Sequence, residues 1–289
     1  MPGFFAIIAP NENSLVKQIF QIENDSAGKV NQVLSLRVGE KHCSFSTSDS
    51  SGSQLNRLTY CTSEDPLVTG WNKNELLAFF TDYSLLPRLF DRVSICYDFP
   101  QSLFISAADY KQEESGLLLA TLGNSYGNQK INAELIPEWN VYNMFNVPGE
   151  VQELFEAAFP AAGYQHQYSL GLKSLNRKDN GAVLAVEFDT DHFNVITVKG
   201  SRFLLAQTFE YVTPADVLYY LLRICQQFSL SRQDVALQLS GLVEKESALY
   251  KELVQYFIHL EFREAVWEQN SGYPAHFFTA LNDLATCAS

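Results

Sequence analysis

Three carboxylates occupy alternate positions in the stretch VEFDTDHFN, as Glu187, Asp189 and Asp191. Carboxylate oxygens can hold Mg²⁺, and a turn between two strands can present backbone N–H groups to a phosphate. This turn contains no glycine, so its side chains obstruct the close backbone approach that a phosphate needs. Aspartate is also frequent in ordinary turns, where its side chain bonds to the backbone. We therefore interpret residues 189–191 as a turn rather than a phosphate- or metal-binding loop.

Two further segments contain residues with possible binding chemistry. In LRVGEKHCS, Arg37 has a forked guanidinium that can pair with phosphate but cannot hold Mg²⁺, and Gly39 leaves space nearby. In LSGLVEKES, a single glycine, Gly241, follows a predicted strand. If the protein binds a nucleotide, we expect Arg37, Gly39, Asp189, Asp191 and Gly241 to line the cleft that holds it.

The remaining reactive side chains match no metal or nucleophile motif. The five cysteines form no CxxC, and the five histidines show neither HxxxH nor HExxH spacing. Asp191 directly precedes His192 and is expected to raise the pKa of its imidazole, but no motif places a nucleophile beside it. We interpret each histidine as a surface residue or a hydrogen-bonded interior residue, and we predict no metal ion.

The composition is that of a packed globular protein, with 46% hydrophobic and 13% aromatic residues among 289. A net charge of −13 argues against binding to nucleic acid or to an anionic membrane surface, because both need clustered Lys and Arg. No apolar run approaches the roughly 20 residues that cross a bilayer, and the N-terminal residues lack the basic region of a signal peptide. Dispersed cysteines suit reduced thiols, so we predict a cytoplasmic protein.

The same order of predicted elements occurs twice along the chain. Alternating apolar residues and a capped helical pattern predict strand, strand, strand, helix and strand in each half. In the first half these elements cover residues 33–38, 41–47, 55–61, 72–86 and 92–98, and in the second half residues 182–188, 192–198, 202–211, 213–228 and 234–240. A strand at 140–147 and a helix at 149–159 complete the first half; a helix at 244–257, a strand at 258–262 and a helix at 274–287 complete the second.

The spacing between equivalent elements locates an insertion. Leu34 and Leu184, in the first strands, are 150 positions apart, and the fourth strands are 142 positions apart, whereas the fifth strands are only 118 positions apart. The drop of 24 positions places extra residues between Asp98 and Glu138. We predict a first domain at residues 1–163, with an N-terminal extension and an insertion near 99–138, and a second domain at residues 164–289. Two such domains would face each other across a cleft.

This duplicated order of elements resembles the ribonuclease-H-like units of the actin-like ATPases. The segments TFEYVTPADVLYYLLRICQQFSL, LQLSGLVEKESALYKEL and YPAHFFTALNDLATC resemble, more specifically, a bacterial family of unknown function with that fold. The resemblance implies an α/β protein of two tandem ribonuclease-H-like βββαβαβα units, distantly similar to pilus-assembly ATPase-like proteins. The general likeness covers residues 33–287, and the specific likeness begins near Ala182.

The nucleotide motifs of actin-like ATPases are only partly present. Such an enzyme needs a glycine-rich turn and a Mg²⁺-organising Asp after the first strand of each half, and a Gly-Gly step beside the adenosine. Here Arg37 stands in place of the first Asp, the second turn has no glycine, and Gly241 is followed by Leu242. The resemblance therefore implies degenerate motifs, and we predict no cofactor; ATP with Mg²⁺ is the alternative.

These observations predict a non-catalytic scaffold that binds a protein or peptide. Pilus-assembly proteins of this fold use a groove for a partner's peptide, which is the analogy behind the prediction. The alternative is a nucleotide-dependent ATPase or small-molecule kinase that uses the inter-domain cleft. A third interpretation is a structural homodimer that associates through exposed aromatic side chains such as one of Tyr219 and Tyr220.

Overall fold

The computed structural model describes residues 16–24, 32–63, 71–123, 128–175, 181–267 and 272–287. The N-terminal stretch in which we predict no signal peptide lies outside these residues, as does most of the polar linker before the second half. Within the described ranges, every helix is too short or too polar to cross a membrane.

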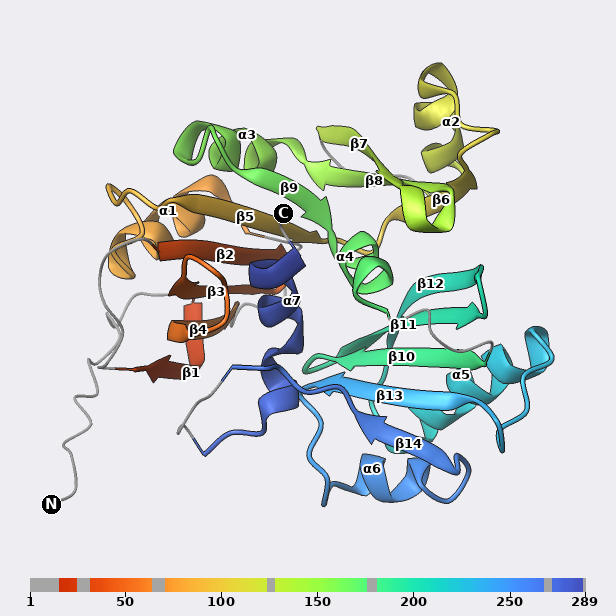
Figure 1. Cartoon of the computed structure of the whole chain (residues 1–289). Coiled ribbons are helices and arrows are strands. Elements are labelled where there is room, and N and C mark those ends of the chain that lie inside the picture. The colour runs from red at the N-terminus through yellow and green to blue at the C-terminus, as the bar shows by residue number, and fades with distance from the viewer. Residues whose placement is uncertain are drawn as a thin grey trace, which may run out of the picture.

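The first half of the chain forms a six-stranded sheet (Figure 1). The order across it is β1-β4-β3-β2-β5-β9, with bounds Val16–Glu23, Leu55–Ser63, His42–Asp49, Gln32–Gly39, Arg92–Asp98 and Gly163–His166. The first four pair antiparallel, and β2, β5 and β9 run parallel. Strand β1 adds to the edge of the three predicted strands and was not predicted, because it lies in the N-terminal extension.

Strand β2 shows why the two faces of this sheet differ. Side chains alternate along a strand, so Leu34, Leu36 and Val38 point to one face and Ser35 and Arg37 to the other. The apolar face packs against helices α1 (Lys73–Asp82) and α3 (Gly149–Ala158) in one large core. The polar face is buried too, because helix α7 (Thr279–Cys287) contacts β2 from the opposite side.

A three-stranded antiparallel sheet is inserted after β5 and corrects one sequence prediction. Its order is β6-β8-β7, with bounds Ser102–Ser106, Val141–Pro148 and Gln129–Ile136, and helix α2 (Ser115–Ala120) precedes β7. The predicted strand at 140–147 is β8, which pairs with β6 and β7 and not with β5. The fifth strand of the first unit is instead β9, which pairs with β5. The apolar alternation of a segment predicts a strand but says nothing of its partner.

The predicted bounds of the insertion and of the first domain are corrected as a result. The insertion runs from β6 to the end of β8 and so extends past the predicted 99–138. The first sheet also extends past residue 163, because β9 continues to His166. His166 then joins strand to helix: its Nδ1 accepts a hydrogen bond from Tyr168 N as the N-cap of α4 (Gln167–Ser174), and its Nε2 donates to Phe99 O.

The second half forms a five-stranded sheet in the order β12-β11-β10-β13-β14. The bounds are Arg202–Glu210, His192–Lys199, Ala182–Phe188, Ala236–Gly241 and His259–Phe262. Helices α5 (Pro214–Gln227) and α6 (Ala248–Leu253) contribute to the core on one face. Helix α5 starts where predicted, at a capping box of Thr213 and Asp216. Helix α6 starts at Ala248 after its N-cap Ser247, later than the predicted start at residue 244.

The two halves repeat the order βββαβαβα, as predicted. The equivalent series are β2-β3-β4-α1-β5-α3-β9-α4 and β10-β11-β12-α5-β13-α6-β14-α7. The last helices of the two series, α4 and α7, pack against each other between the two sheets (Figure 1). The two halves are therefore related by an approximate two-fold axis through the centre of the molecule.

The segment after β14 returns to the first sheet. Trp267, Phe278 and Leu281 share a buried cluster with Phe20 and Leu58 of that sheet. The Trp267 indole donates a hydrogen bond to Gly52 O at 2.8 Å. The C-terminal residues therefore complete the core of the first sheet as well as the second half of the repeat.

Replacing Trp267 tests this connection. Trp267→Ala is expected to lower the free energy of unfolding by about 3–5 kcal/mol, because it empties a buried aromatic site and leaves Gly52 O without its donor. The neighbouring Val266 has 71% of its surface exposed, so Val266→Ala should change that energy by less than about 0.5 kcal/mol. Urea denaturation measures both, and equal losses for the two variants would contradict the packing described here.

Candidate functional site

The tips of two equivalent hairpins meet between the domains. One hairpin joins β2 to β3, where Val38 pairs with Cys43, and the other joins β10 to β11, where Phe188 pairs with Phe193. The two turns have the same length, and equivalent residues are 150 positions apart, the interval already apparent from the first strands. Alternation along β2 and β10 places Arg37 and Glu187 on the faces that point between the domains.

Oppositely charged residues at equivalent positions pair across this contact. Arg37 Nη1 donates to Glu187 Oε1, and Lys41 Nζ lies 2.6 Å from Asp191 Oδ2; the members of each pair are 150 residues apart. The rings of His42 and His192, separated by the same interval, face each other with centroids 6.4 Å apart. In a contact around a two-fold axis, residues on the axis meet their own counterparts. If the two halves were identical, like charges would meet at this contact and repel each other. The sequences of the two turns differ, so opposite charges meet there and attract each other.

Arg37 is held by a second carboxylate, that of Asp98 at the end of β5. The Asp98 side chain is only 1% exposed, and its Oδ2 lies 2.6 Å from Arg37 Nη2. Burial alone would raise the pKa of Asp98, but the charges of Arg37 and His42 and the hydrogen bond to His42 hold it well below its usual range. Burial lowers the pKa of Arg37, and the charges of Asp98 and Glu187 outweigh this effect and raise it. The pair therefore stays ionised.

A second set of contacts surrounds Asp189. Tyr60 donates its hydroxyl to the Asp189 carboxylate, with oxygen separations of 2.7 and 2.6 Å. His42 lies between two carboxylates: Nδ1 is 3.5 Å from Asp189 Oδ2, and Nε2 is 3.1 Å from Asp98 Oδ2. Burial raises the pKa of Tyr60, and the charge of Asp189 raises it further, so the phenol keeps its proton and remains a donor.

His192 completes the group. Its Nδ1 lies 2.8 Å from Asp191 Oδ1. Burial lowers the pKa of His192, but the charges of Asp189 and Asp98 and the bond to Asp191 outweigh burial, so the pKa is raised. The effect of Asp191 that the sequence predicted is therefore present, although Asp189 and Asp98 contribute as well.

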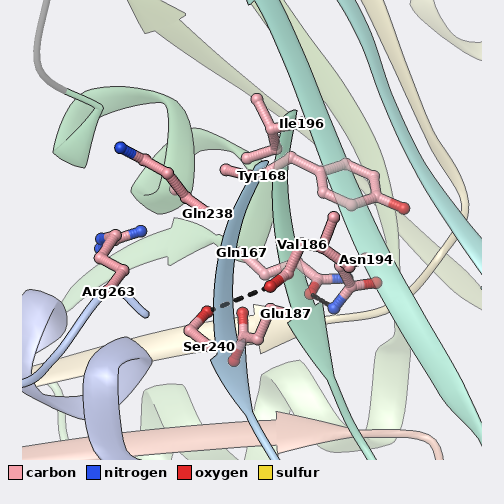
Figure 2. A pocket seen from close by; sticks show the side chains of 11 residues that line it. Gln167, Tyr168, Val186, Glu187, Asn194, Ile196, Gln238, Ser240 and Arg263 are labelled. Carbon is pink, nitrogen blue, oxygen red and sulfur yellow. Dashed lines mark hydrogen bonds between the residues drawn. The ribbon is translucent and has the colours of Figure 1, made fainter. Parts of the chain in front are cut away.

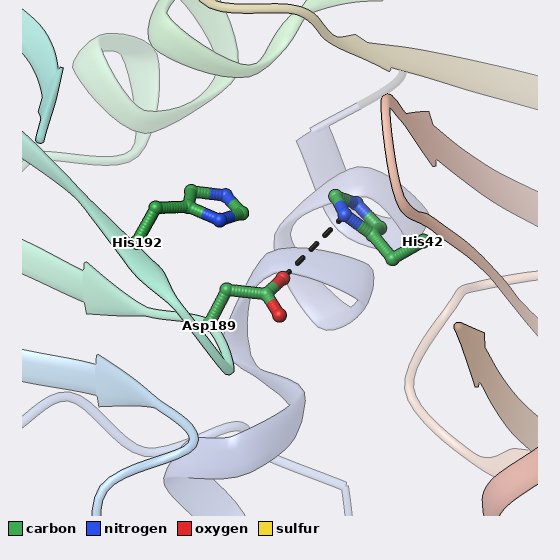
Figure 3. Close-up of side chains that lie close together, drawn as sticks. All are labelled: His42, Asp189 and His192. Atoms are coloured by element: carbon green, nitrogen blue, oxygen red, sulfur yellow. Dashed lines mark ion pairs between the residues drawn. The ribbon is translucent and has the colours of Figure 1, made fainter. Parts of the chain in front are cut away.

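His42, Asp189 and His192 are also the described residues whose donor atoms cluster as metal ligands do (Figure 3). Each offers one potential ligand atom, and these atoms lie within 4.8 Å of one another. Figure 3 shows His192 and Asp189 coming from the second domain and His42 from the first. Sequence spacing gave no sign of this group, because its histidines are 150 residues apart.

The five residues predicted to line a nucleotide cleft all lie at this end of the two sheets. Arg37, Asp189 and Asp191 join the ion pairs. A Cβ on Gly39 would collide with His42 Cε1, and a Cβ on Gly241 would collide with Phe188 O. Gly241 also has a φ of +76°, which favours glycine. At both positions, the missing side chain therefore leaves space that neighbouring atoms of the protein occupy.

The residues that sequence reasoning missed are the partners of the predicted ones. Lys41, His42, Tyr60 and Asp98 belong to no motif, and Glu187 was noted only for its charge. One signal was available: at an offset of 150, Lys41 aligns with Asp191, an opposite charge. Asp98 and Tyr60 gave no such signal, because their contacts depend on how strands from different parts of the chain pair.

Two small cavities lie at the interface. The larger holds about 30 Å³ and lies between α4 and the second sheet, lined by residues that include Gln167, Glu187, Asn194 and Ser240 (Figure 2). The other holds about 20 Å³ and is lined in part by Arg37 and Glu187. A water molecule needs roughly 10–15 Å³ on this measure, whereas ligand pockets span about 300–1,000 Å³. Each cavity therefore has room for one or two waters.

The other histidines have structural or surface positions, in line with the sequence interpretation. His166 is fully buried as a helix cap, and burial lowers its pKa to about 4, so it is neutral. His276 is buried and its Nε2 lies 2.6 Å from Val243 O, whereas His259 is exposed. Only His42 and His192, among the described histidines, face the inter-domain ion pairs.

Two asparagine substitutions separate the buried ion pair from the exposed one. Asp98→Asn removes a carboxylate from the buried guanidinium of Arg37 and is expected to lower the free energy of unfolding by about 3–5 kcal/mol. The control is Asp191→Asn. The Asp191 side chain is 44% exposed and its partner Lys41 is 54% exposed, so this substitution should lower the free energy of unfolding by less than about 1 kcal/mol. Urea denaturation at neutral pH compares them, and a loss below about 1 kcal/mol for Asp98→Asn would show that the buried pair does not stabilise the closed interface.

Comparison with solved structures confirms the predicted fold. A protein of unknown function with an actin-like ATPase fold from Bacteroides thetaiotaomicron VPI-5482 is 20% identical over 89% of this chain and 96% of that one, with a TM-score of 0.72. A chain of the PilM–PilN type IV pilus biogenesis complex is 11% identical over 89% of this chain and 98% of that one, with a TM-score of 0.60. At these identities the likeness concerns the fold alone.

Comparison by sequence gives a family and no individual relative. A search of curated proteins finds no match. A family profile described as "Protein of unknown function (DUF3822)" matches residues 22–260, which is most of the chain. The match covers both hairpins and Asp98, so it includes all the residues of the inter-domain site. The chain therefore belongs to the DUF3822 family of proteins of unknown function.

Proposed function

We propose that this protein is a non-catalytic scaffold of the actin-like fold, which binds a protein or peptide and does not hydrolyse nucleotide. The observation that carries the proposal is the buried contact of Arg37 with Asp98 and Glu187. A guanidinium that serves a phosphate must have free N–H donors directed at it. Here each terminal nitrogen of Arg37 already pairs with a carboxylate of the protein, Nη2 with Asp98 and Nη1 with Glu187.

The charge around Arg37 supports the same conclusion. Two cationic side chains, Arg37 and Lys41, stand among four carboxylates, those of Asp98, Glu187, Asp189 and Asp191. A polyphosphate entering this region would be repelled by the excess negative charge and would have to displace existing ion pairs. Without a metal ion this balance of charge disfavours a nucleotide, which is why the geometry favours the scaffold over the ATPase or kinase alternative.

Three observations bear on the proposed partner and location. The structural neighbour from the PilM–PilN complex is part of an assembly with another protein, which suggests a protein partner by analogy of fold. The inserted sheet and α2 expose apolar side chains, with Leu117 74%, Ile131 50% and Leu135 43% exposed, and exposed apolar side chains of this kind are available for a protein contact. The four described cysteines are free thiols, which suits a cytoplasmic protein.

Nucleotide binding is the property that distinguishes the scaffold from its alternative. We expect millimolar ATP or ADP, with or without Mg²⁺, to leave the melting temperature of the protein unchanged, because a ligand stabilises a protein only if it binds the folded form. Differential scanning calorimetry provides the measurement. A Mg²⁺-dependent rise of several degrees that disappears in Asp189→Asn, each compared with its own nucleotide-free baseline, would restore the ATPase or kinase.

The proposed contact surface is tested by an exposed leucine on the insertion. Affinity capture followed by mass spectrometry is expected to recover one partner with the wild type and to lose it with Leu117→Glu, because a charge interrupts the apolar patch. Leu89→Glu is the control, since Leu89 is 98% exposed and lies outside the insertion. Equal recovery by both variants would remove the insertion as the contact surface. Light scattering at two concentrations tests the homodimer, which would show a mass that rises with concentration.

A further inference from the structure

The group formed by His42, Asp189 and His192 has the chemistry of a metal site. Two imidazoles and a carboxylate suit Zn²⁺ and similar first-row ions, whereas Mg²⁺ prefers oxygen ligands. We propose that these three residues bind one divalent transition-metal ion, for which Zn²⁺ is the appropriate probe, and that the ion joins the two domains. His42 opens β3 of the first domain, and Asp189 and His192 flank the β10–β11 turn of the second.

The geometry fits such an ion with small adjustments. His42 Nδ1 and Asp189 Oδ2 are 3.5 Å apart, and the three potential ligand atoms lie within 4.8 Å of one another. In a tetrahedral zinc site with bonds of about 2.0–2.1 Å, ligand atoms lie roughly 3.3 Å apart. The His42–Asp189 separation already matches this value. The third ligand would come from His192, which opens β11 beside the turn and is 19% exposed.

Each of the three residues has an outer polar group close to it. His42 Nε2 lies 3.1 Å from Asp98, the Asp189 carboxylate accepts the Tyr60 hydroxyl, and His192 Nδ1 lies 2.8 Å from Asp191. Histidines that bind metals almost always use their second nitrogen on a carboxylate, carbonyl or water, and the carboxylate ligands are hydrogen-bonded in turn. This arrangement leaves Nδ1 of His42 and Nε2 of His192 as the nitrogens for the ion.

The charge balance of the site points to the same ion. The four carboxylates exceed Arg37 and Lys41 by two negative charges. Asp98 and Asp189 are buried, so this excess is costly unless positive charge compensates it. A divalent ion between two neutral imidazoles supplies the two charges.

The test uses the full chain after removal of metal with EDTA. Zn²⁺ alone is added in competition with a chromophoric chelator, and we expect one equivalent to bind and to raise the melting temperature. His192→Gln should weaken binding at least about a hundredfold, and Asp191→Asn, which removes an outer partner, about 10–100-fold. His259→Gln, an exposed histidine outside the group, should bind like the wild type.

The variants are chosen so that loss of folding cannot imitate loss of binding. His192 and Asp191 are partly exposed, and circular dichroism in EDTA should show the wild-type fold for both. Co²⁺ in place of Zn²⁺ should give the visible spectrum of a site with nitrogen ligands, and it should be absent in His192→Gln. Failure of the wild type to bind Zn²⁺, or equal binding by His192→Gln, would overturn the proposal. Stabilisation by Mg²⁺ alone would also overturn it, since it would indicate an oxygen-ligand site. None of these outcomes depends on whether a nucleotide or a protein partner binds.

Discussion

Arg37 brings a positive charge to a place where its side chain is 9% exposed, and the rest of the structure has to accommodate this charge. Removing a guanidinium from water costs several kcal/mol, which carboxylates offset only when they are held close and well oriented. Asp98 comes from the same sheet, but Glu187 comes from the other domain. The relative position of the two domains is therefore constrained at this contact. The packing of α4 on α7 and the return of the C-terminal segment to the first sheet supply the rigidity that the ion pair requires.

The contact also shows how a duplicated unit can diverge. If two identical hairpins met tip to tip around a two-fold axis, the residues on the axis would face their own copies, and like charges there would repel each other. In this chain the counterpart of Arg37 is Glu187 and the counterpart of Lys41 is Asp191. Among the residues of the two turns, His42 and His192 keep the same residue type, and their rings face each other. Covalent linkage of the two units in one chain is what allows their sequences to differ in this way.

Most of the architecture followed from local patterns, because alternation, capping and turn residues act over a few positions. The order βββαβ in each half and the capping box of Thr213 and Asp216 depend on such signals. The full βββαβαβα repeat was implied by the resemblance, and β9 and α4 were not predicted. The assignment of β8 failed for the complementary reason: strand pairing is set by distant segments. Asp98 and Tyr60 were missed for the same cause, since each gains its role from a residue on another strand. The offset of 150 was the one long-range signal in the sequence, and it predicts the Lys41–Asp191 pair when the two turns are aligned.

The return of the C-terminal segment has a consequence for how the chain folds during synthesis. The cluster that contains Phe20, Leu58 and Trp267 joins residues from the start of the chain to residues near its end. Domains commonly fold in order as they leave the ribosome, N-terminal first. Here the first sheet can form early, but one of its apolar surfaces stays uncovered until the last helix, Thr279–Cys287, has emerged. The nascent chain therefore carries an uncovered apolar surface on its first sheet until the segment from Trp267 to Ala285 has left the ribosome.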